Sequence, residues 1–158
     1  MIKCIEIYDL PACLDVIHKS FLTVAEESGL TKENAPTNGA YIPLKRLEDE
    51  FEKGTMMYGL YDQDKIVGFI QLKDKGDHIF EIGKLSVLPE YRHKGYGKML
   101  LDFAKDKAIA AGGKVIEIGI KEDNLRLKDW YTQYGFVHTG TSRFPHVIFE
   151  VGFMALKL

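Results

Sequence analysis

A short stretch near the middle of the chain, VLPEYRHKGYGKMLL (residues 87–101), gathers positive charges and glycines directly in front of an apolar pattern of helical period. Its charged and flexible residues are Arg92, Lys94, Gly95, Gly97 and Lys98. The first turn of a helix carries partial positive charge and N–H groups without acceptors, so a phosphate binds well there. Glycine, which lacks a Cβ, lets the main chain approach such an anion closely. The stretch therefore predicts a site for a polyphosphate.

Two common phosphate-binding motifs do not fit this stretch. A Walker A loop has the pattern GxxxxGK[ST], and GYGKM offers neither that spacing nor the hydroxyl. The dinucleotide pattern GxGxxG would need a third glycine at position 100, where the chain has Leu100. A solvated loop whose glycines only permit a turn remains an alternative for GYG taken alone.

The elements that must position this loop follow from the spacing of apolar residues. Alternating or continuous apolar runs predict strands over residues 2–7, 55–61, 65–72, 78–88, 115–120, 136–144 and 148–158. Apolar stripes of helical period predict helices from residue 9 to near residue 29 and over 44–53, 98–111 and 125–134. The strands on either side of the third helix are expected to lie parallel, through a right-handed crossover. The order predicts an α/β fold, with one mixed, mostly antiparallel sheet of about seven strands and helices on both faces, in a single domain over residues 1–158.

The bulk properties exclude several classes of function. The 158 residues carry a formal net charge of −2, whereas a nucleic-acid-binding domain is normally strongly basic. No apolar run reaches the roughly 20 residues that span a bilayer, and the N-terminus lacks the layout of a signal peptide. Cys4 and Cys13 form no CxxC pair and have no metal-like histidine spacing nearby. We therefore expect a cytoplasmic protein with reduced cysteines, without a metal and without nucleic-acid or membrane partners.

Two segments together indicate a family. LSVLPEYRHKGYG resembles the acyl-CoA loop of the GNAT N-acetyltransferases, whose pattern [QR]xxGx[GA] is met by Arg92, Gly95 and Gly97. NLRLKDWYTQYGF (residues 124–136) resembles the family's second signature, NxxAxxxYxxxGF, with Leu127 in place of the usual small residue. The expected order of elements also resembles that of the family, and the likeness is weakest before residue 55.

The resemblance implies an acetyl-CoA site built mainly from main-chain groups. The pyrophosphate is expected on the amides of residues 92–98, and the pantetheine arm is expected to bond like an extra strand to Leu85 and Val87, where two strands splay. The Val87 N–H would hold the thioester carbonyl. Asn124 is expected to contact the cofactor, and a helix N-cap role also fits it. The expected cofactor-binding residues are Leu85, Ser86, Val87, Arg92, His93, Lys94, Gly95, Tyr96, Gly97, Lys98 and Asn124.

The resemblance also assigns the proton transfers. Acetyl transfer to an amine needs a base for the ammonium, a donor for the oxyanion and an acid for the leaving thiolate. Tyr131 is expected to be the acid, because a phenol of pKa about 10 keeps its proton at neutral pH; a core aromatic is the alternative. Glu81 matches by spacing the glutamate that histone-type members use as a base, and partial desolvation would raise its pKa. A solvent-facing polar residue, with a water chain as the base, is the alternative. By chemistry alone, His78, His138 and His146 are further candidates.

The expected function is direct transfer of an acetyl group from acetyl-CoA to a primary amine of a small molecule or peptide, without a covalent enzyme intermediate. The segment from Gly29 to Arg46 is expected to shape the acceptor site, and its sequence does not identify the amine. A CoA-binding sensor domain without turnover and a self-associating structural domain are the alternatives. Analogy with the family also leaves a homodimer open.

Overall fold

The computed structural model describes the whole chain, from Met1 to Leu158. Its seven-stranded sheet has the strand order β1-β2-β3-β4-β5-β7-β6. The strands are β1 (Ile2–Cys4), β2 (Met56–Asp62), β3 (Lys65–Asp74), β4 (Ile79–Val87), β5 (Val115–Lys121), β6 (Val137–Ser142) and β7 (Val151–Lys157). The helices are α1 (Leu10–Glu27), α2 (Leu44–Glu52), α3 (Tyr96–Ala110) and α4 (Leu125–Tyr134), with 3-10 turns η1 (Ile7–Asp9) and η2 (Pro89–Tyr91). The predicted order of strands and helices is confirmed along the chain.

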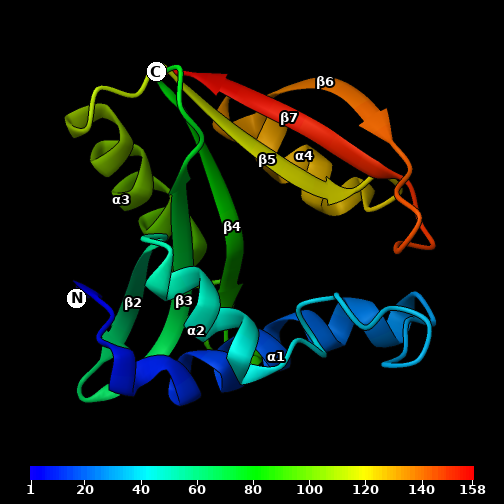
Figure 1. Cartoon of the computed structure of the whole chain (residues 1–158), viewed down its shortest axis with the longest axis horizontal. Coiled ribbons are helices and arrows are strands. Elements are labelled where there is room, and N and C mark those ends of the chain that lie inside the picture. Colours follow the sequence, from blue (N-terminus) through cyan, green and yellow to red (C-terminus); the bar gives the residue numbers. More distant parts are fainter.

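All neighbouring strands run antiparallel except β4 and β5, which are parallel. The prediction of a mixed, mostly antiparallel sheet is therefore confirmed. Figure 1 shows α1 and α2 over one face of the sheet and α3 and α4 over the other. The last strand, β7, lies between β5 and β6, so the final hairpin joins the sheet through its second strand and leaves β6 at the edge.

Several strand and helix boundaries differ from the predictions by a few residues, among them the end of the first strand and the start of the third helix. The first strand ends at Cys4 rather than at residue 7, because the Glu6 N–H donates to the Asp9 carboxylate at 3.0 Å and the chain turns there. Helix α3 begins at Tyr96, two residues before the predicted start, so Gly97 lies within its first turn. The glycine-rich loop is therefore shorter than expected and leads straight into the helix.

The parallel strands β4 and β5 pair only at one end. Three residue pairs join them, at residues 79–81 of β4 and 115–117 of β5. Beyond this point β4 continues beside β3, and β5 continues beside β7. The two strands diverge, which Figure 1 shows as a V that opens away from the C-terminus. A bulge in β4, where Lys84 has a φ of 52°, accompanies the divergence. The inner edges of both strands are thus left without a strand partner.

The main core contains 28 buried residues and joins the sheet to its helices. Helix α3 contributes the buried residues Leu100, Leu101, Ala104 and Ala108. A Cβ on Gly68 of β3 would come within 2.9 Å of Leu100, so this glycine lets α3 lie close to the sheet. Packing of this face fixes the N-terminus of α3 beside the end of β4. No helix has the length and apolar character needed to cross a lipid bilayer.

Candidate active site

The loop between β4 and α3 presents six successive amides, those of residues 93–98, that donate no hydrogen bond within the protein. The preceding amide is bonded, since the Arg92 N–H donates to Pro89 O at 3.2 Å. The next bonded amide is that of Met99, which donates to Gly95 O at 3.0 Å. A run of free donors at the positive end of a long helix is suited to an anion with several oxygens. The main chain therefore fits a pyrophosphate.

The backbone conformation of this loop turns its donors toward open space. His93 and Gly95 both have left-handed φ values, of 63° and 79°. A Cβ on Gly95 would meet no atom within 4 Å, and one on Gly97 would only touch the Trp130 ring, at 3.6 Å. The left-handed conformation costs a non-glycine residue about 1–2 kcal/mol, so the strain at His93 is held by the surrounding loop.

The cations of the loop are less available than the sequence suggests. The Arg92 guanidinium faces α1, where Nη2 donates to Ser20 O at 2.8 Å and Nη1 to Thr23 Oγ1 at 3.3 Å. Lys98 pairs with Asp102, one turn along α3, at 2.8 Å. Lys94 Nζ lies 5.4 Å from the centroid of the Tyr91 ring. The free amides are therefore donors that the protein leaves without any partner, and the role of these three cations around an anion stays a prediction.

The end of β4 exposes main-chain groups on the side of the V. Ser86 pairs with Phe69 of β3, and N–H groups alternate between the two edges of a strand. The main chain of Leu85 and Val87 consequently points away from β3. The Val87 N–H donates to the Ser20 hydroxyl of α1 at 3.2 Å. The amide predicted to hold a thioester carbonyl thus already has an acceptor, which the sequence did not predict, because 67 residues separate the partners.

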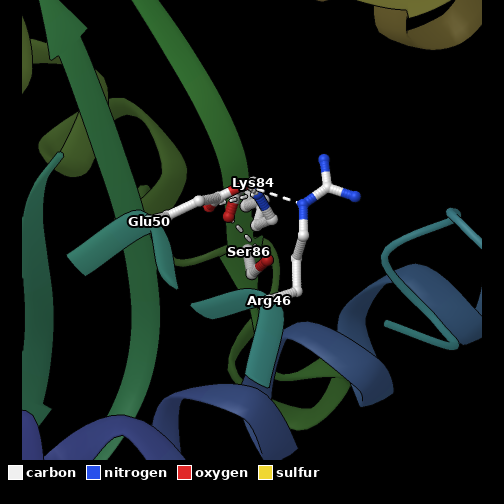
Figure 2. A network of polar contacts seen from close by, with 4 residues as sticks. All are labelled: Arg46, Glu50, Lys84 and Ser86. Atoms are coloured by element: carbon white, nitrogen blue, oxygen red, sulfur yellow. Dashed lines mark hydrogen bonds and ion pairs between the residues drawn. The ribbon is translucent and has the colours of Figure 1, made fainter. Parts of the chain in front are cut away.

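A buried ion pair holds the bulge of β4 against α2 (Figure 2). Lys84 Nζ donates to the Glu50 carboxylate at 2.8 Å, and Arg46 Nε donates to the same group at 3.0 Å. The Ser86 hydroxyl donates to Lys84 O at 2.8 Å. Burial lowers the pKa of the Lys84 ammonium, although its bond to Glu50 opposes the change. Burial also acts to raise the pKa of Glu50, but the bonds from Lys84, Arg46 and Gln71 outweigh it, and the pKa is lowered. The pair therefore fixes the backbone just before Leu85.

Tyr131 of α4 is a buried aromatic residue with an unpaired hydroxyl. Only 5 % of its surface is exposed, and the rings of Trp130 and Phe136 lie 5.0 and 5.3 Å from its own. Its hydroxyl has no hydrogen-bond partner in the protein. The only side-chain polar atom that is both fully buried and without a partner is Gln71 Oε1, so the Tyr131 hydroxyl is not fully buried. The Tyr131 hydroxyl therefore reaches an accessible space. Burial raises the pKa of this phenol, so it holds its proton across the neutral range.

Asn124 caps α4. Its Oδ1 accepts the Leu127 N–H at 3.2 Å, which satisfies one of the free donors of the first turn. The N-cap role is therefore observed, and the predicted cofactor contact would use the side-chain NH₂ group, which donates no bond within the protein.

Glu81 lies at the last residue pair that joins β4 and β5, so it precedes the V. Its side chain is 43 % exposed and pairs with Lys75 at 3.5 Å. The carboxylate is thus partly buried and partly open to water. Its role as a base remains a prediction.

The three histidines named by chemistry alone have other surroundings. His78 contacts the Gly112 carbonyl at 3.1 Å, and His138 pairs with Glu122 at 2.9 Å. His146 is exposed in the turn before β7. No group of three or more His, Cys, Asp or Glu residues is arranged to hold a metal ion.

A cavity of about 380 Å³ lies at the wide end of the V, between the end of α1, the end of β5 and the segment before β7. Its charged lining residues are Lys121, Glu122, Asp123, Arg143 and Glu150. Lys121 is paired with Asp123, and Glu122 accepts bonds from Lys128 and His138. Of the segment predicted to shape the acceptor site, only Leu30 reaches this cavity. The sequence did not predict the other lining residues, because they come together only when the strands assemble in the order of the folded sheet.

Comparison with known proteins decides the family. The sequence model described as Acetyltransferase (GNAT) family matches residues 20–136. The chain belongs to this family. The resemblance seen in the two motifs is thus confirmed, and the protein is an acyltransferase of the GNAT type.

Individual relatives extend the match over most of the chain. An uncharacterized N-acetyltransferase in the pepI 3′ region of Lactobacillus delbrueckii subsp. lactis is 24% identical over 157 residues, which cover 91% of this chain and 85% of that one. An uncharacterized N-acetyltransferase of Schizosaccharomyces pombe is 30% identical over 106 residues, covering 65% of this chain and 72% of that one.

Solved structures show the same fold. The PaiA N-acetyltransferase of Thermoplasma acidophilum, in complex with coenzyme A, superposes with a TM-score of 0.76 at 20% identity and covers 100% of this chain and 98% of that one. The ribosomal-protein-alanine N-acetyltransferase of Brucella melitensis superposes with a TM-score of 0.74 at 21% identity, covering 100% and 99%.

Proposed function

We propose that the GNAT chain transfers an acetyl group from acetyl-CoA directly to a primary amine of a small molecule or peptide. The observation that carries the proposal is the run of six free amides at residues 93–98, at the N-terminus of α3 and beside the V between β4 and β5. The structural relatives include an N-acetyltransferase crystallised with coenzyme A, and the free donors of this chain fit the diphosphate of that molecule.

The loop and the end of β4 divide the binding of the co-substrate between them. The amides of residues 93–98 would hold the pyrophosphate, with Lys94 as the least engaged nearby cation. The outward-facing main chain of Leu85 and Val87 would bond to the amides of the pantetheine arm, as in strand addition. The side-chain NH₂ of Asn124 lies at the start of α4, on the β5 side of the V, and would bond to the pantetheine from that side.

The bound co-substrate supplies an activated acyl group as a thioester. Tyr131 would protonate the departing sulfur, because burial keeps the phenol neutral and its hydroxyl has no other partner. Glu81 lies at the narrow end of the V, away from the cavity at the wide end, so it would accept the proton of the amine through a chain of waters. Neither cysteine has a role in this scheme. Burial raises the pKa of Cys13 to about 12, so this thiol is a poor nucleophile at neutral pH.

The cavity at the wide end of the V is the proposed acceptor side. Both carboxylates and cations line it, and Phe149 adds an apolar surface. Relatives carry names of both kinds of acceptor, a ribosomal-protein-alanine N-acetyltransferase and a streptothricin acetyltransferase of Escherichia coli. The proposal therefore keeps peptide and small-molecule amines together.

Two measurements on the purified chain test the proposal. Isothermal titration should show that CoA binds far more tightly than inorganic phosphate. Release of free thiol from acetyl-CoA should rise above its rate in buffer with at least one amine of a panel of amino acids, polyamines, aminoglycosides and peptides with free N-termini. Binding of CoA no tighter than that of phosphate would contradict the co-substrate. Tight binding without amine-dependent thiol release would favour a sensor domain.

A further inference from the structure

Helix α1 contacts the co-substrate region at two points through one residue, Ser20. The Ser20 hydroxyl accepts the Val87 N–H at 3.2 Å, and the Ser20 carbonyl accepts Arg92 Nη2 at 2.8 Å. Val87 ends β4, and Arg92 immediately precedes the run of free amides at residues 93–98. Ser20 therefore stands where the proposed pantetheine strand meets the proposed pyrophosphate loop.

The hydroxyl of Ser20 has a proton that the protein does not use. A serine inside a helix commonly donates this proton to a carbonyl one turn earlier, but Ser20 Oγ takes part only in the bond from Val87. Ser20 is half-buried, so the unused donor is neither freely hydrated nor enclosed. A hydroxyl that accepts one hydrogen bond becomes a stronger donor for the next.

The surroundings favour a partner that carries partial negative charge. The Arg92 guanidinium donates a hydrogen bond to the carbonyl of Ser20 itself, so a positive charge lies beside this turn of α1. The second contact of Arg92 in this turn, Thr23 Oγ1, is neutral. A carbonyl oxygen that becomes more negative during the reaction would gain from this environment.

We infer that Ser20 is a catalytic residue whose hydroxyl donates a hydrogen bond to the thioester carbonyl oxygen, while the Val87 N–H holds and polarises that hydroxyl. This inference rests on the proposed function. No bond to Ser20 forms or breaks, and its proton stays on Oγ throughout. The arrangement differs from direct donation by Val87, in which the carbonyl would have to displace Ser20 from the amide.

The two arrangements predict opposite effects of Ser20→Ala. If Ser20 is the donor, the variant should lose roughly 10²-fold in kcat/KM for acetyl-CoA, the usual effect of removing one donor to an oxyanion. Its affinity for acetyl-CoA should fall about fivefold, the size of one net hydrogen bond, and its affinity for CoA, which has no acyl carbonyl, should not change. If the carbonyl displaces Ser20, removal of the hydroxyl should leave the rate unchanged and tighten acetyl-CoA binding.

Two matched variants complete the experiment. Ser20→Thr keeps the hydroxyl and should retain most of the rate. Thr23→Ala removes a contact between α1 and Arg92 without touching Val87, so it should behave like the wild type. Equal losses of CoA and acetyl-CoA affinity in Ser20→Ala would overturn the inference, because they make Ser20 merely structural. A wild-type rate would also overturn it, because the Ser20 hydroxyl then does not stabilise the transition state.

The wild type tests the proposed function separately. If it binds CoA no better than phosphate, the function fails and the role of Ser20 fails with it. If it binds both ligands but turns over no amine, the ratio of acetyl-CoA to CoA affinity in wild type and Ser20→Ala still decides the role of Ser20. Alanine favours helix more than serine does, so α1 should remain folded, and thermal unfolding of each variant checks this.

Discussion

At the scale of single residues, the buried surroundings of Tyr131 keep its phenol protonated at neutral pH. Two aromatic rings pack against it in T-shaped contacts. No charged side chain contributes to its raised pKa, which has burial as its cause. A phenol in such a place donates well only to a strong base, and a thiolate leaving the acyl group becomes one as the bond breaks.

Tyr131→Phe keeps the ring contacts and removes only the hydroxyl. We expect kcat to fall by a factor on the order of 10² to 10⁴, the usual contribution of a general acid, and the affinity for CoA to stay within a factor of about two, since the loop amides are untouched. Single-turnover rates and calorimetry measure the two quantities. Tyr134→Phe is the control, because the Tyr134 hydroxyl is bonded to Asp102 and is not free. A Tyr131→Phe enzyme as fast as wild type would remove the hydroxyl from the reaction.

Gly97 offers a separate test of the free amides. A Cβ at this position makes only ordinary contact with Trp130, so Gly97→Ala should fold and bind CoA with moderate loss. Gly97→Asp places a carboxylate among the same donors. This variant should lose CoA binding by at least about 10²-fold while keeping its thermal stability, because an acidic residue in the first turn suits the helix dipole. Retained CoA affinity in Gly97→Asp would show that the diphosphate lies elsewhere.

At the scale of elements, the bulge of β4 shapes the V, and α2 holds that bulge. The contact joins Glu50 and Lys84, 34 residues apart, and both side chains are mostly buried, with 20 % and 15 % exposed. The helical spacing of apolar residues predicted α2 and its boundaries well, but this spacing shows only that one face of the helix is apolar. It could not say that a glutamate on that helix would meet a lysine in a left-handed conformation on a distant strand.

Glu50→Gln removes the countercharge of a buried ammonium, so we expect a loss of about 3 kcal/mol in the free energy of unfolding. The folded-state pKa of Glu50 is lowered from 4.5, so the carboxylate stabilises the fold above that value, and this contribution is lost as pH falls through the folded-state pKa. Wild type should therefore lose stability in acid more steeply than Glu50→Gln. Urea titrations from neutral pH down into the acid range, below the folded-state pKa of Glu50, measure both effects.

An exposed pair on the same helix supplies the control. Lys45 and Asp49 are 78 % and 44 % exposed, so Asp49→Asn should leave stability unchanged. If Glu50→Gln is as stable as Asp49→Asn at neutral pH, the buried pair does not hold the bulge.

At the scale of the whole molecule, the sheet consists of two halves with few connections. One half contains β1 to β4 and the other β5, β7 and β6, and three residue pairs join them within the sheet. Behind the sheet, the Tyr134 hydroxyl donates to Asp102 at 2.5 Å and ties α4 to α3. The proposed ligand would lie between the halves and touch both.

The sequence predicted the parts of this arrangement that depend on nearby residues. The helix after Gly95, the cap at Asn124 and the succession of strands and helices along the chain all follow from local signals. The bond from Val87 to Ser20, the turn of Arg92 toward α1 and the cavity at Arg143 and Glu150 depend on elements that meet only after folding. These are also the features that would place acceptor and acyl group in the proposed function, which is why the sequence predicted the co-substrate better than the amine.

Because a ligand that bridges the halves binds only the folded chain, CoA should raise the melting temperature. At a concentration of 100 times its Kd the stabilisation is about 2.7 kcal/mol, which for a chain of this length corresponds to roughly 5–10 °C. Hydrogen exchange of the free amides at residues 93–98 should slow on binding, as should exchange in the residues of β4 and α4 that face the V. Gly97→Asp should show neither change. Protection confined to the loop, with no slowing in α4, would mean that the ligand holds one half of the sheet and leaves Tyr131 out of reach of the acyl group.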